Sequence, residues 1–416
     1  MPNLKRSKIE VKIYGQSVGY LVSKDNMVYF EYDSTFKAKQ LEISPLKLST
    51  KETSVYTNTD DRYFNSLAGV FSDSLPDKFG NKIIDKYYEQ KGLYDEKLNI
   101  LQRLAYIGSN AMGALEYVPS VLTDEIKESL EIRHLVEEAR QVLQGNIQTT
   151  IPEIMEAGAS AGGARAKAVV QWNKESHDIL SGRIEPKTGY EQYIIKFDGV
   201  SADKKSEDYT KIEYIYMRIA KLSDLNVAEV ELMQERDYAH LLVKRFDRVA
   251  GKKIHMHSLC GMTHTDFNMS GLYSYEEYLQ TVKRVVNHYD ALIDAYGHMV
   301  FNIISSNQDD HTKNFSFLMD ESGEWNISPI YDLTYSHGTG YTAKHQMKVN
   351  GKQGDFTLED LLKVAQKAGI KTSDAKLIIE HIQTIFYENF EKMAKELEVD
   401  EERIKRILGH TRRFDV

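Results

Sequence analysis

The stretch SSNQDDHTKNFSF, residues 305–317, concentrates two acids, a histidine, a lysine and two asparagines directly after an apolar run. The apolar run predicts a helix that stops near Ser305. After the polar stretch, FSFLMDESGEWNI (315–327) alternates apolar and polar residues around a Ser-Gly pair, which predicts a β-hairpin. Asp332 follows the hairpin and a proline turn. The interpretation of the whole chain depends on this order of helix, polar loop, hairpin and acid.

The first forty residues alternate apolar and polar side chains in three short runs, at 11–13, 18–22 and 28–32. Turn-forming pairs at 15–16 and 25–26 separate the runs. Alternation with period two is typical of half-buried strands. The pattern predicts a meander or a small barrel at the N-terminus.

The periodicity changes to a helical one from about Tyr63. The first helical stretch has a break at Pro76 and a stop at Gly92. A second helix is predicted to end near Gly108 and to be followed by a strand. Residues 123–147 are charged and amphipathic, which predicts a further helix.

A second β-rich part follows, with AKAVVQW (166–172), YEQYIIKFDG (190–199) and HLLVKRFDRV (240–249) as short strands. A helix over Ser206–Leu222 separates the last two strands. Beyond residue 270 the apolar spacing is mostly helical. The fold class is therefore predicted to be α+β, with a mixed β lobe between a β-rich N-terminal part and a helical C-terminal part.

Composition narrows the class of protein. The chain has 416 residues, a net charge of −9 and a single cysteine, Cys260. The negative charge argues against strong nucleic-acid binding by this chain alone, because phosphate contacts require clustered Lys and Arg. The first residues lack a signal-peptide pattern, and no run approaches the roughly 20 apolar residues of a membrane span. We expect a cytoplasmic protein that does not bind membranes.

A glycine-rich stretch and a lysine within a strand are the two other notable features of the predicted β lobe. The glycine-rich stretch GASAGGARAKAVV (158–170) suits close approach of backbone N–H groups to phosphate, although a structural turn is the simpler interpretation. Lys196 lies in an otherwise apolar strand, where burial is costly unless an anion meets it. A lysine that extends to water is an equally good interpretation. Glu213, on the following helix, is positioned in sequence to form an ion pair with Lys196.

Taken together, these features occur in the order used for phosphoryl transfer in protein kinases. One aspartate orients and deprotonates a hydroxyl, while an asparagine shortly after it and an aspartate beyond a hairpin hold Mg²⁺. A strand lysine and a glycine-rich loop bind the phosphates of ATP. Each feature alone is weak, but all four appear here in sequence.

The motifs also resemble a known family. NQDDHTKNFSF followed by SPIYDL, with SAGGARAK and LLVKRFDR upstream, is similar to the HipA family of bacterial serine/threonine kinases, the toxins of HipA–HipB type toxin–antitoxin modules. VFSDSLPDKFGNKII and YIGSNAMGALEY resemble the N-terminal domain of that family. The resemblance implies a HipA-type N-terminal domain (1–125), a kinase N-lobe-like part (126–246) and a helical C-lobe (247–416), the last two forming a bilobal protein-kinase-like fold.

The resemblance also implies roles for individual residues. Asp309 would be the catalytic base, Asn314 and Asp332 the Mg²⁺ ligands, and Ser160 the site of autophosphorylation. Lys244, Arg245 and Phe246 would form a hinge that binds adenine through backbone groups. Position 244 is a lysine where an acidic residue is frequent in the family. The residues implied to bind ATP are Gly162, Gly163, Ala164, Arg165, Ala166, Lys167, Lys196, Lys244, Arg245, Phe246, His311 and Tyr331.

The implied activity is ATP- and Mg²⁺-dependent phosphorylation of a protein on serine or threonine, with growth arrest as the result. The implied substrate is a translation component such as an aminoacyl-tRNA synthetase, with glutamyl-tRNA synthetase as the best guess. The implied partner is a helix-turn-helix antitoxin of HipB type, through which the chain would meet DNA only indirectly. A small-molecule phosphotransferase remains an alternative, and so does a chain that acts mainly as a DNA-bound co-repressor with the antitoxin.

Several other residues attract attention without supporting a site. His255, His257 and His264, with Asp266, resemble a metal-binding group, but we expect them in an exposed connection and do not predict a metal there. Asp310 is expected to be a solvated loop acid. Cys260 is expected to be a small buried apolar residue. The charged stretch 392–413 is expected to be a solvated helix face with a basic end.

Overall fold

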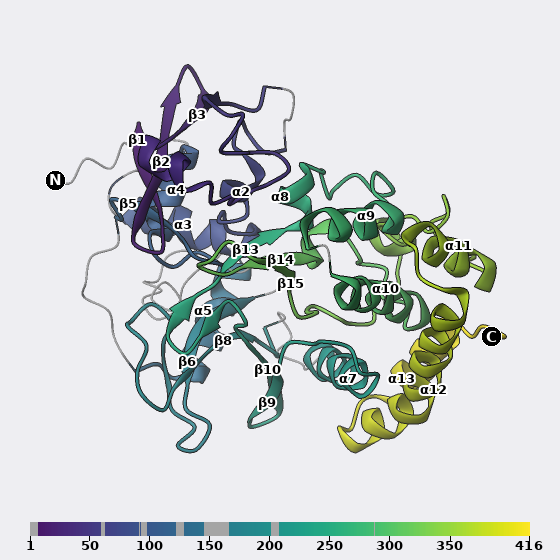
Figure 1. Cartoon of the computed structure of the whole chain (residues 1–416). Coiled ribbons are helices and arrows are strands. Elements are labelled where there is room, and N and C mark those ends of the chain that lie inside the picture. The colour runs from purple at the N-terminus through teal and green to yellow at the C-terminus, as the bar shows by residue number, and fades with distance from the viewer. Residues whose placement is uncertain are drawn as a thin grey trace.

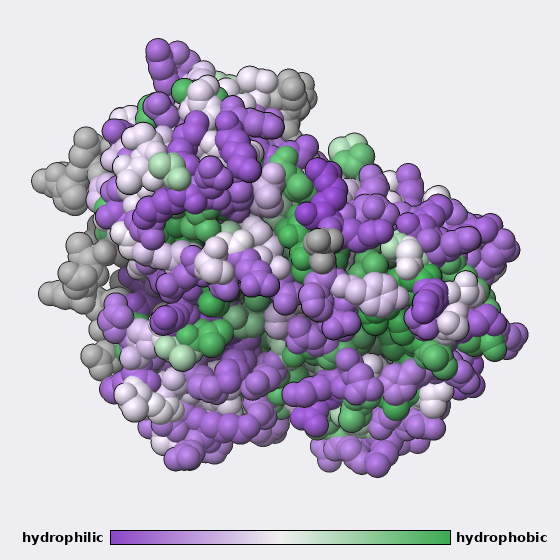
Figure 2. Space-filling model, in the orientation of Figure 1, coloured by the Kyte–Doolittle hydropathy of each residue, from purple (hydrophilic) through white to green (hydrophobic). Residues whose placement is uncertain are grey.

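The computed structural model describes residues 7–59, 63–90, 92, 98–121, 129–144, 166–200, 208–286 and 288–416. Figure 1 shows three regions: an N-terminal β-rich domain, a second sheet beneath it, and a helical region that ends with the C-terminus. None of the helices in this described part of the chain is both long and apolar enough to cross a bilayer. Hydrophilic residues dominate the face seen in Figure 2, and apolar ones show mainly in its creases.

The N-terminal domain is an antiparallel sheet covered by helices. Its strands are β1 (Lys8–Ile13), β2 (Gln16–Lys24), β3 (Met27–Tyr32), β4 (Val55–Tyr56) and β5 (Leu115–Val118), and its helices are α1 (Ser34–Lys39), α2 (Gly69–Ser72), α3 (Lys78–Gln90) and α4 (Ile100–Ile107). The strand order is β4-β3-β2-β1-β5. Ile9, Val11 and Ile13 are all fully buried, because alternate side chains of β1 face the helices. The predicted meander is confirmed, and β5 extends it at the β1 edge.

The second sheet forms the β lobe. Its strands are β6 (Lys167–Trp172), β7 (Ile179–Ser181), β8 (Glu191–Lys196), β9 (Val230–Glu235) and β10 (Tyr238–Lys244), in the order β7-β6-β8-β10-β9. Helix α7 (Tyr209–Leu222) lies between β8 and β9 in the chain, as the sequence predicts, and α5 (Ile132–Gln144) precedes β6. Lys167 on β6 is directly paired with Lys196 on β8, so both side chains leave the same face of the sheet.

A small sheet joins the β lobe to the helical region. It consists of β13 (His255–Ser258), β14 (Ser316–Met319) and β15 (Trp325–Ile327). The separate two-stranded sheet of β11 (Arg248–Val249) and β12 (Lys252–Lys253) precedes it in the chain. Strands β14 and β15 form the predicted hairpin. Helix α8 (Leu259–Thr263) follows β13, and the 3-10 helices η1 (Thr312–Asn314) and η2 (Gly340–Ala343) lie in the polar loops.

The helical region has a core of aromatic and aliphatic side chains. Its helices are α9 (Tyr275–Val285), α10 (Tyr289–Ile304), α11 (Leu358–Ala368), α12 (Thr372–Glu396) and α13 (Glu401–His410). Tyr216 of α7 packs edge-on against Phe301, Phe386 and Phe390, with ring centroids 5.6 to 6.1 Å apart. This aromatic cluster fixes α7, and thus the β lobe, against α10 and α12.

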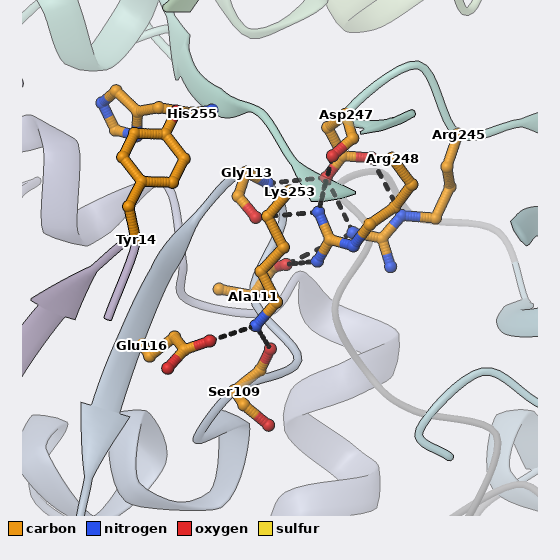
Figure 3. Close-up of polar contacts among 10 residues, drawn as sticks. All are labelled: Tyr14, Ser109, Ala111, Gly113, Glu116, Arg245, Asp247, Arg248, Lys253 and His255. Atoms are coloured by element: carbon orange, nitrogen blue, oxygen red, sulfur yellow. Dashed lines mark hydrogen bonds and ion pairs between the residues drawn. The ribbon is translucent and has the colours of Figure 1, made fainter. Parts of the chain in front are cut away.

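The N-terminal domain is attached to the β lobe through Asp247, whose side chain is fully buried. The guanidinium groups of Arg245 and Arg248 donate to its carboxylate at 2.7–2.9 Å, and the Gly113 N–H donates at 2.7 Å. Both arginines also donate to the Ala111 carbonyl. Figure 3 shows these groups closing around one another, with the separate Lys253–Glu116 ion pair beside them.

Candidate active site

The polar loop after α10 is fixed in place by its second aspartate. Asp310 is fully buried, and its carboxylate accepts hydrogen bonds from the Tyr275 hydroxyl (2.8 Å), the Gln346 N–H (2.6 Å) and, at 2.8 Å, His345 Nδ1. The expectation of a solvated acid at position 310 was wrong, because three donors from distant segments replace its water. Its burial holds the loop backbone next to Asp309.

Asp309, the predicted catalytic base, lies on the open side of this loop, with its side chain 40% exposed. The Asp309 carbonyl accepts from the His311 N–H and from Asn314 Nδ2, both at 2.9 Å. These two bonds close the loop into a tight turn that continues as η1. The exposed part of the side chain is where a substrate hydroxyl could reach the carboxylate.

His311 lies beside Asp309, with Nε2 3.8 Å from the nearer carboxylate oxygen. Its ring packs on Phe267, with centroids 4.8 Å apart. Burial lowers the pKa of His311, against the opposing effect of Asp309. A neutral imidazole next to the base can accept or donate a hydrogen bond without adding a full charge.

Lys196, Glu213 and Asp332 form the second part of the site. Lys196 Nζ lies 2.5 Å from Glu213 Oε1 and also forms an ion pair with Asp332 Oδ1. Although burial disfavours the charged amine, Asp332 and Glu213 raise the pKa of Lys196 to about 12. The ion pair predicted between Lys196 and Glu213 is present in the structure.

Asp332 has an unusual backbone conformation. Its φ is +56°, in the left-handed region that residues other than glycine seldom adopt. Burial of the carboxyl group favours its neutral form, but Lys196 and Lys167 outweigh that effect and lower the pKa of Asp332. The ionised side chain already contacts the Lys196 amine. Because it is also 30% exposed, a second cation can reach it.

The chemistry of these donors suits Mg²⁺. Asn314 and Asp332 offer an amide oxygen and a carboxylate, the hard ligands that Mg²⁺ prefers, and a cation already contacts the Asp332 carboxylate. Within the described residues, no group of three or more His, Cys, Asp or Glu is arranged to hold a metal ion. Two protein ligands are what a Mg²⁺ ion shared with substrate phosphates requires.

The predicted adenine-binding residues lie at the end of β10. The Lys244 N–H donates to the Glu229 carbonyl and the Arg245 N–H to the Gln192 carbonyl, both at 2.8 Å, so these two donors are already used. The Arg245 side chain is buried against Asp247 and points to the N-terminal domain. The Phe246 ring lies 5.6 Å from that of Tyr331, the neighbour of Asp332.

Some residues of the predicted phosphate loop lie outside the described part of the chain. They are Ser160, Gly162, Gly163, Ala164 and Arg165. Ala166 and Lys167, where the described chain resumes, are both buried. Lys167 stands beside Lys196, and both lysines lower the pKa of Asp332. The structure thus brings together Lys167, Lys196, Glu213, His311 and Asp332.

The histidine-rich strand β13 is not an exposed connection, so that expectation was wrong. His255 and His257 are fully buried against the N-terminal domain. His257 contacts Asp73 at 2.6 Å and Ser44 at 3.1 Å, and His255 contacts the Ile43 carbonyl at 2.9 Å. Cys260 is fully buried, as expected, and burial raises the pKa of its thiol to about 12.

The last residue of α13 and the segment that follows it support the start of the polar loop, which the sequence did not indicate. The Ser306 hydroxyl donates to the His410 carbonyl at 2.5 Å, and the Arg412 N–H donates to the Ile304 carbonyl at 3.0 Å. The Tyr335 hydroxyl contacts His410 Nδ1 at 2.6 Å. These contacts tie together the loop, the segment after Asp332 and the end of α13.

Comparison with known families gives two matches along the chain. Residues 9–118 match the family described as HipA N-terminal domain, and residues 159–413 match the HipA-like C-terminal domain. The second match covers more than half of the chain and contains every residue assigned above to the candidate site.

Individual relatives give weaker but consistent likenesses. A serine/threonine-protein kinase toxin HipA of Shewanella oneidensis is 25% identical over 294 residues, which cover 65% of this chain and 63% of the relative. The Y4mE protein of Sinorhizobium fredii is 30% identical over 137 residues, which cover 30% of this chain and 32% of the relative. The chain therefore aligns with less than two thirds of the length of these relatives.

One solved structure has a similar fold. It is the HipA, HipB and operator DNA complex of Shewanella oneidensis MR-1, whose matched chain gives a TM-score of 0.69 at 18% sequence identity. The likeness covers 97% of this chain and 94% of the matched chain. An α+β fold with a β-rich N-terminal domain before a kinase-like body is thus confirmed.

Proposed function

The chain belongs to the HipA family, and from this premise we propose that it is an ATP- and Mg²⁺-dependent protein serine/threonine kinase that acts as a growth-arresting toxin. The observation that carries the proposal is the ion-paired group of Lys196, Glu213 and Asp332. This group sits next to a loop whose buried Asp310 leaves the Asp309 carboxylate on the open side. Such an arrangement provides fixed cations for phosphates and a base for a hydroxyl.

In the proposed reaction, Asp309 accepts the proton of a serine or threonine hydroxyl as the hydroxyl oxygen bonds to the γ-phosphorus. The bond between the γ-phosphorus and the bridging oxygen breaks, and ADP leaves. Lys196 and Lys167 bind phosphate oxygens, and Glu213 holds Lys196 in place. Asn314 and Asp332 would hold Mg²⁺, which neutralises phosphate charge when bound.

Phe246 and Tyr331 are proposed to line the adenine side of the site, together with the backbone carbonyl groups of Lys244 and Arg245, because the N–H groups of those two residues are already used. Backbone recognition tolerates a lysine at position 244, whose side chain already pairs with Glu191 at 2.5 Å. His311 would lie beside the phosphates. The remaining ATP-binding residues are proposed to be Gly162, Gly163, Ala164, Arg165 and Ala166.

Regulation is proposed to follow the family. Phosphorylation of Ser160 would place negative charge in the phosphate loop and oppose ATP binding. A HipB-like helix-turn-helix antitoxin would hold the chain and link it to DNA, as in the similar HipA, HipB and operator DNA complex. The proposed protein substrate is an aminoacyl-tRNA synthetase, with glutamyl-tRNA synthetase as the first candidate, and the proposed location is the cytoplasm.

The test is transfer of radiolabel from ATP to protein in a lysate, with the wild type, Asp309→Asn and Asp332→Asn compared. Asp224→Asn is the matched control, because Asp224 has a similar φ of +58° and an 88% exposed side chain away from the site. We expect labelling by the wild type and the control only. Equal labelling by all four proteins would contradict the proposed roles.

The same assay separates the alternatives. A small-molecule phosphotransferase would consume ATP only when its metabolite is present and would label no protein. A chain that acts mainly as a co-repressor would leave ATP unused whether protein or a metabolite is offered as the phosphate acceptor. It would still alter operator binding by the antitoxin.

A further inference from the structure

An acid of the N-terminal domain reaches the phosphate side of the candidate site. Asp77 directly precedes α3, and its Oδ2 lies 3.1 Å from Lys167 Nζ on β6. Both side chains are buried, with 8% and 7% exposure. The contact is close enough for an ion pair, and charge attraction between the two groups is its larger effect.

Lys167 needs such an acid because of its neighbour. Lys167 and Lys196 are direct cross-strand partners, and like charges in that arrangement repel each other. Lys196 is balanced by Glu213 and Asp332. Among the described residues, Asp77 is the acid in ion-pair contact with Lys167. Each lysine of the pair therefore has a separate acidic partner from a different part of the chain.

We propose that Asp77 is a positioning residue for nucleotide binding, which holds Lys167 charged and directed toward the phosphates of ATP. Through Asp77 the N-terminal domain becomes part of the nucleotide site. This inference rests on the proposed function, because it assumes that Lys167 and Lys196 bind a nucleotide.

Because Lys167 is buried, its charged form depends on the negative charge of Asp77. Burial lowers the pKa of Lys167, and the attraction of Asp77 and Asp332 opposes that change. Burial likewise raises the pKa of Asp77, against Lys167. Without the Asp77 charge, Lys167 would be a buried amine beside a second cation, and it would lose its proton or its orientation.

Asp77 also has a structural role that the test must leave intact. Its other oxygen, Oδ1, accepts a hydrogen bond from the Gly80 N–H at 2.7 Å, in the first turn of α3. Asparagine and serine are both good residues at a helix N-terminus. Asp77→Asn and Asp77→Ser therefore remove the charge and retain a helix-capping side chain.

The experiment measures KM for ATP and kcat in the labelling assay, and the rise in Tm caused by Mg·ATP, for full-length protein. We expect Asp77→Asn and Asp77→Ser to raise KM for ATP about tenfold with little change in kcat. Asp77→Glu retains the charge and is expected to stay near the wild-type KM. The Tm shift by Mg·ATP reports binding without turnover.

Two comparisons separate this role from a purely structural one. Glu116→Gln breaks another ion pair between the N-terminal domain and the rest of the chain, the one with Lys253, and is expected to leave KM unchanged. Asp77→Asn added to Lys167→Met is expected to raise KM no further than Lys167→Met alone, because the two residues act as one unit.

An unchanged KM in the two neutral variants, or effects of Asp77 and Lys167 that multiply in the double variant, would overturn the inference. A KM raised equally by Asp77→Glu and Asp77→Asn would overturn it too, because charge would then not be the cause. A wild type that neither binds Mg·ATP nor transfers phosphate would overturn the proposed function itself.

Discussion

Asp247 and Asp332 are both acids held by cations, yet they lie in very different surroundings. Asp247 is fully buried and receives two guanidinium groups and a backbone N–H. Asp332 is 30% exposed, has a left-handed backbone, and pairs with the single amine of Lys196. The first group joins two domains, and the second lies at the candidate site.

The comparison shows how the ion cluster proposed to bind a ligand differs from the one that joins the two domains. The pKa of Asp247 is lowered to about 2, because Arg245 and Arg248 outweigh the effect of burial. The pKa of Asp332 is lowered in the same direction. A lowered pKa is therefore no guide to function. The distinction lies in whether the protein already satisfies the carboxylate from every side, as it does for Asp247 (Figure 3).

The largest expected effect is on catalysis at the open cluster. Asp332→Asn should reduce phosphate transfer about 10³-fold or more, equivalent to ~4 kcal/mol in the barrier. Asparagine tolerates the left-handed backbone and Lys196 keeps Glu213 as a partner, so the free energy of unfolding should fall less than in Asp247→Asn. Labelling kinetics and urea denaturation of the same protein test both statements, with Asp224→Asn as the control. A large loss of stability would mean that Asp332, like Asp247, is structural.

The next effect is on stability at the closed cluster. Asp247→Asn leaves two buried guanidinium groups without their carboxylate, which should lower the free energy of unfolding by about 3–5 kcal/mol. Urea denaturation measures this value. The KM for ATP of the folded fraction should stay close to the wild type. A stable Asp247→Asn protein with poor ATP binding would reverse the roles assigned to the two clusters.

Acid should affect the closed cluster in a defined pH range. The pKa of Asp247 is about 2 in the folded chain, below the usual ~3.9 of an unfolded aspartate. The stabilisation it provides is complete above about pH 5 and is lost progressively as the pH falls toward 2, by on the order of 2–3 kcal/mol. Free energies of unfolding from pH 5 down to pH 3 should fall more steeply for the wild type than for Asp247→Asn. Parallel curves would contradict the assignment.

The smallest effect is expected at the neighbouring, more exposed pair of Lys253 and Glu116, whose side chains are 28% and 30% exposed. Glu116→Gln should lower the free energy of unfolding by no more than about 1 kcal/mol, since water screens partly exposed pairs. Chemical denaturation at low and high salt gives the value. A loss as large as that of Asp247→Asn would show that exposure does not separate the two contacts.

Local patterns in the sequence were sufficient for most elements. Alternation predicted β1 to β3, and the Ser-Gly tip predicted the β14–β15 hairpin. The Lys196–Glu213 ion pair was predicted from a strand followed by a helix, whereas the roles of Asn314 and Asp332 stay predictions. These successes depend on residues close in sequence or in a recognisable order.

Features that depend on distant segments could not be predicted in this way. Asp310 looked solvated because its donors lie 35 and 36 residues away. His255 and His257 looked exposed because the N-terminal domain that covers them is more than 180 residues away in sequence. The Asp77–Lys167 pair had no signal of its own, because the packing of two domains creates it.

The anchoring of the polar loop by the end of α13 and the segment after it has a consequence for biosynthesis. Ser306 is tied to a carbonyl 104 positions further along the chain, and Ile304 to the N–H of Arg412. While a ribosome is still translating the α11 and α12 codons, the emerging polypeptide already contains Asp309 but lacks these tethers. The candidate base would thus lie on a loop without these tethers until that distal stretch has emerged and docked.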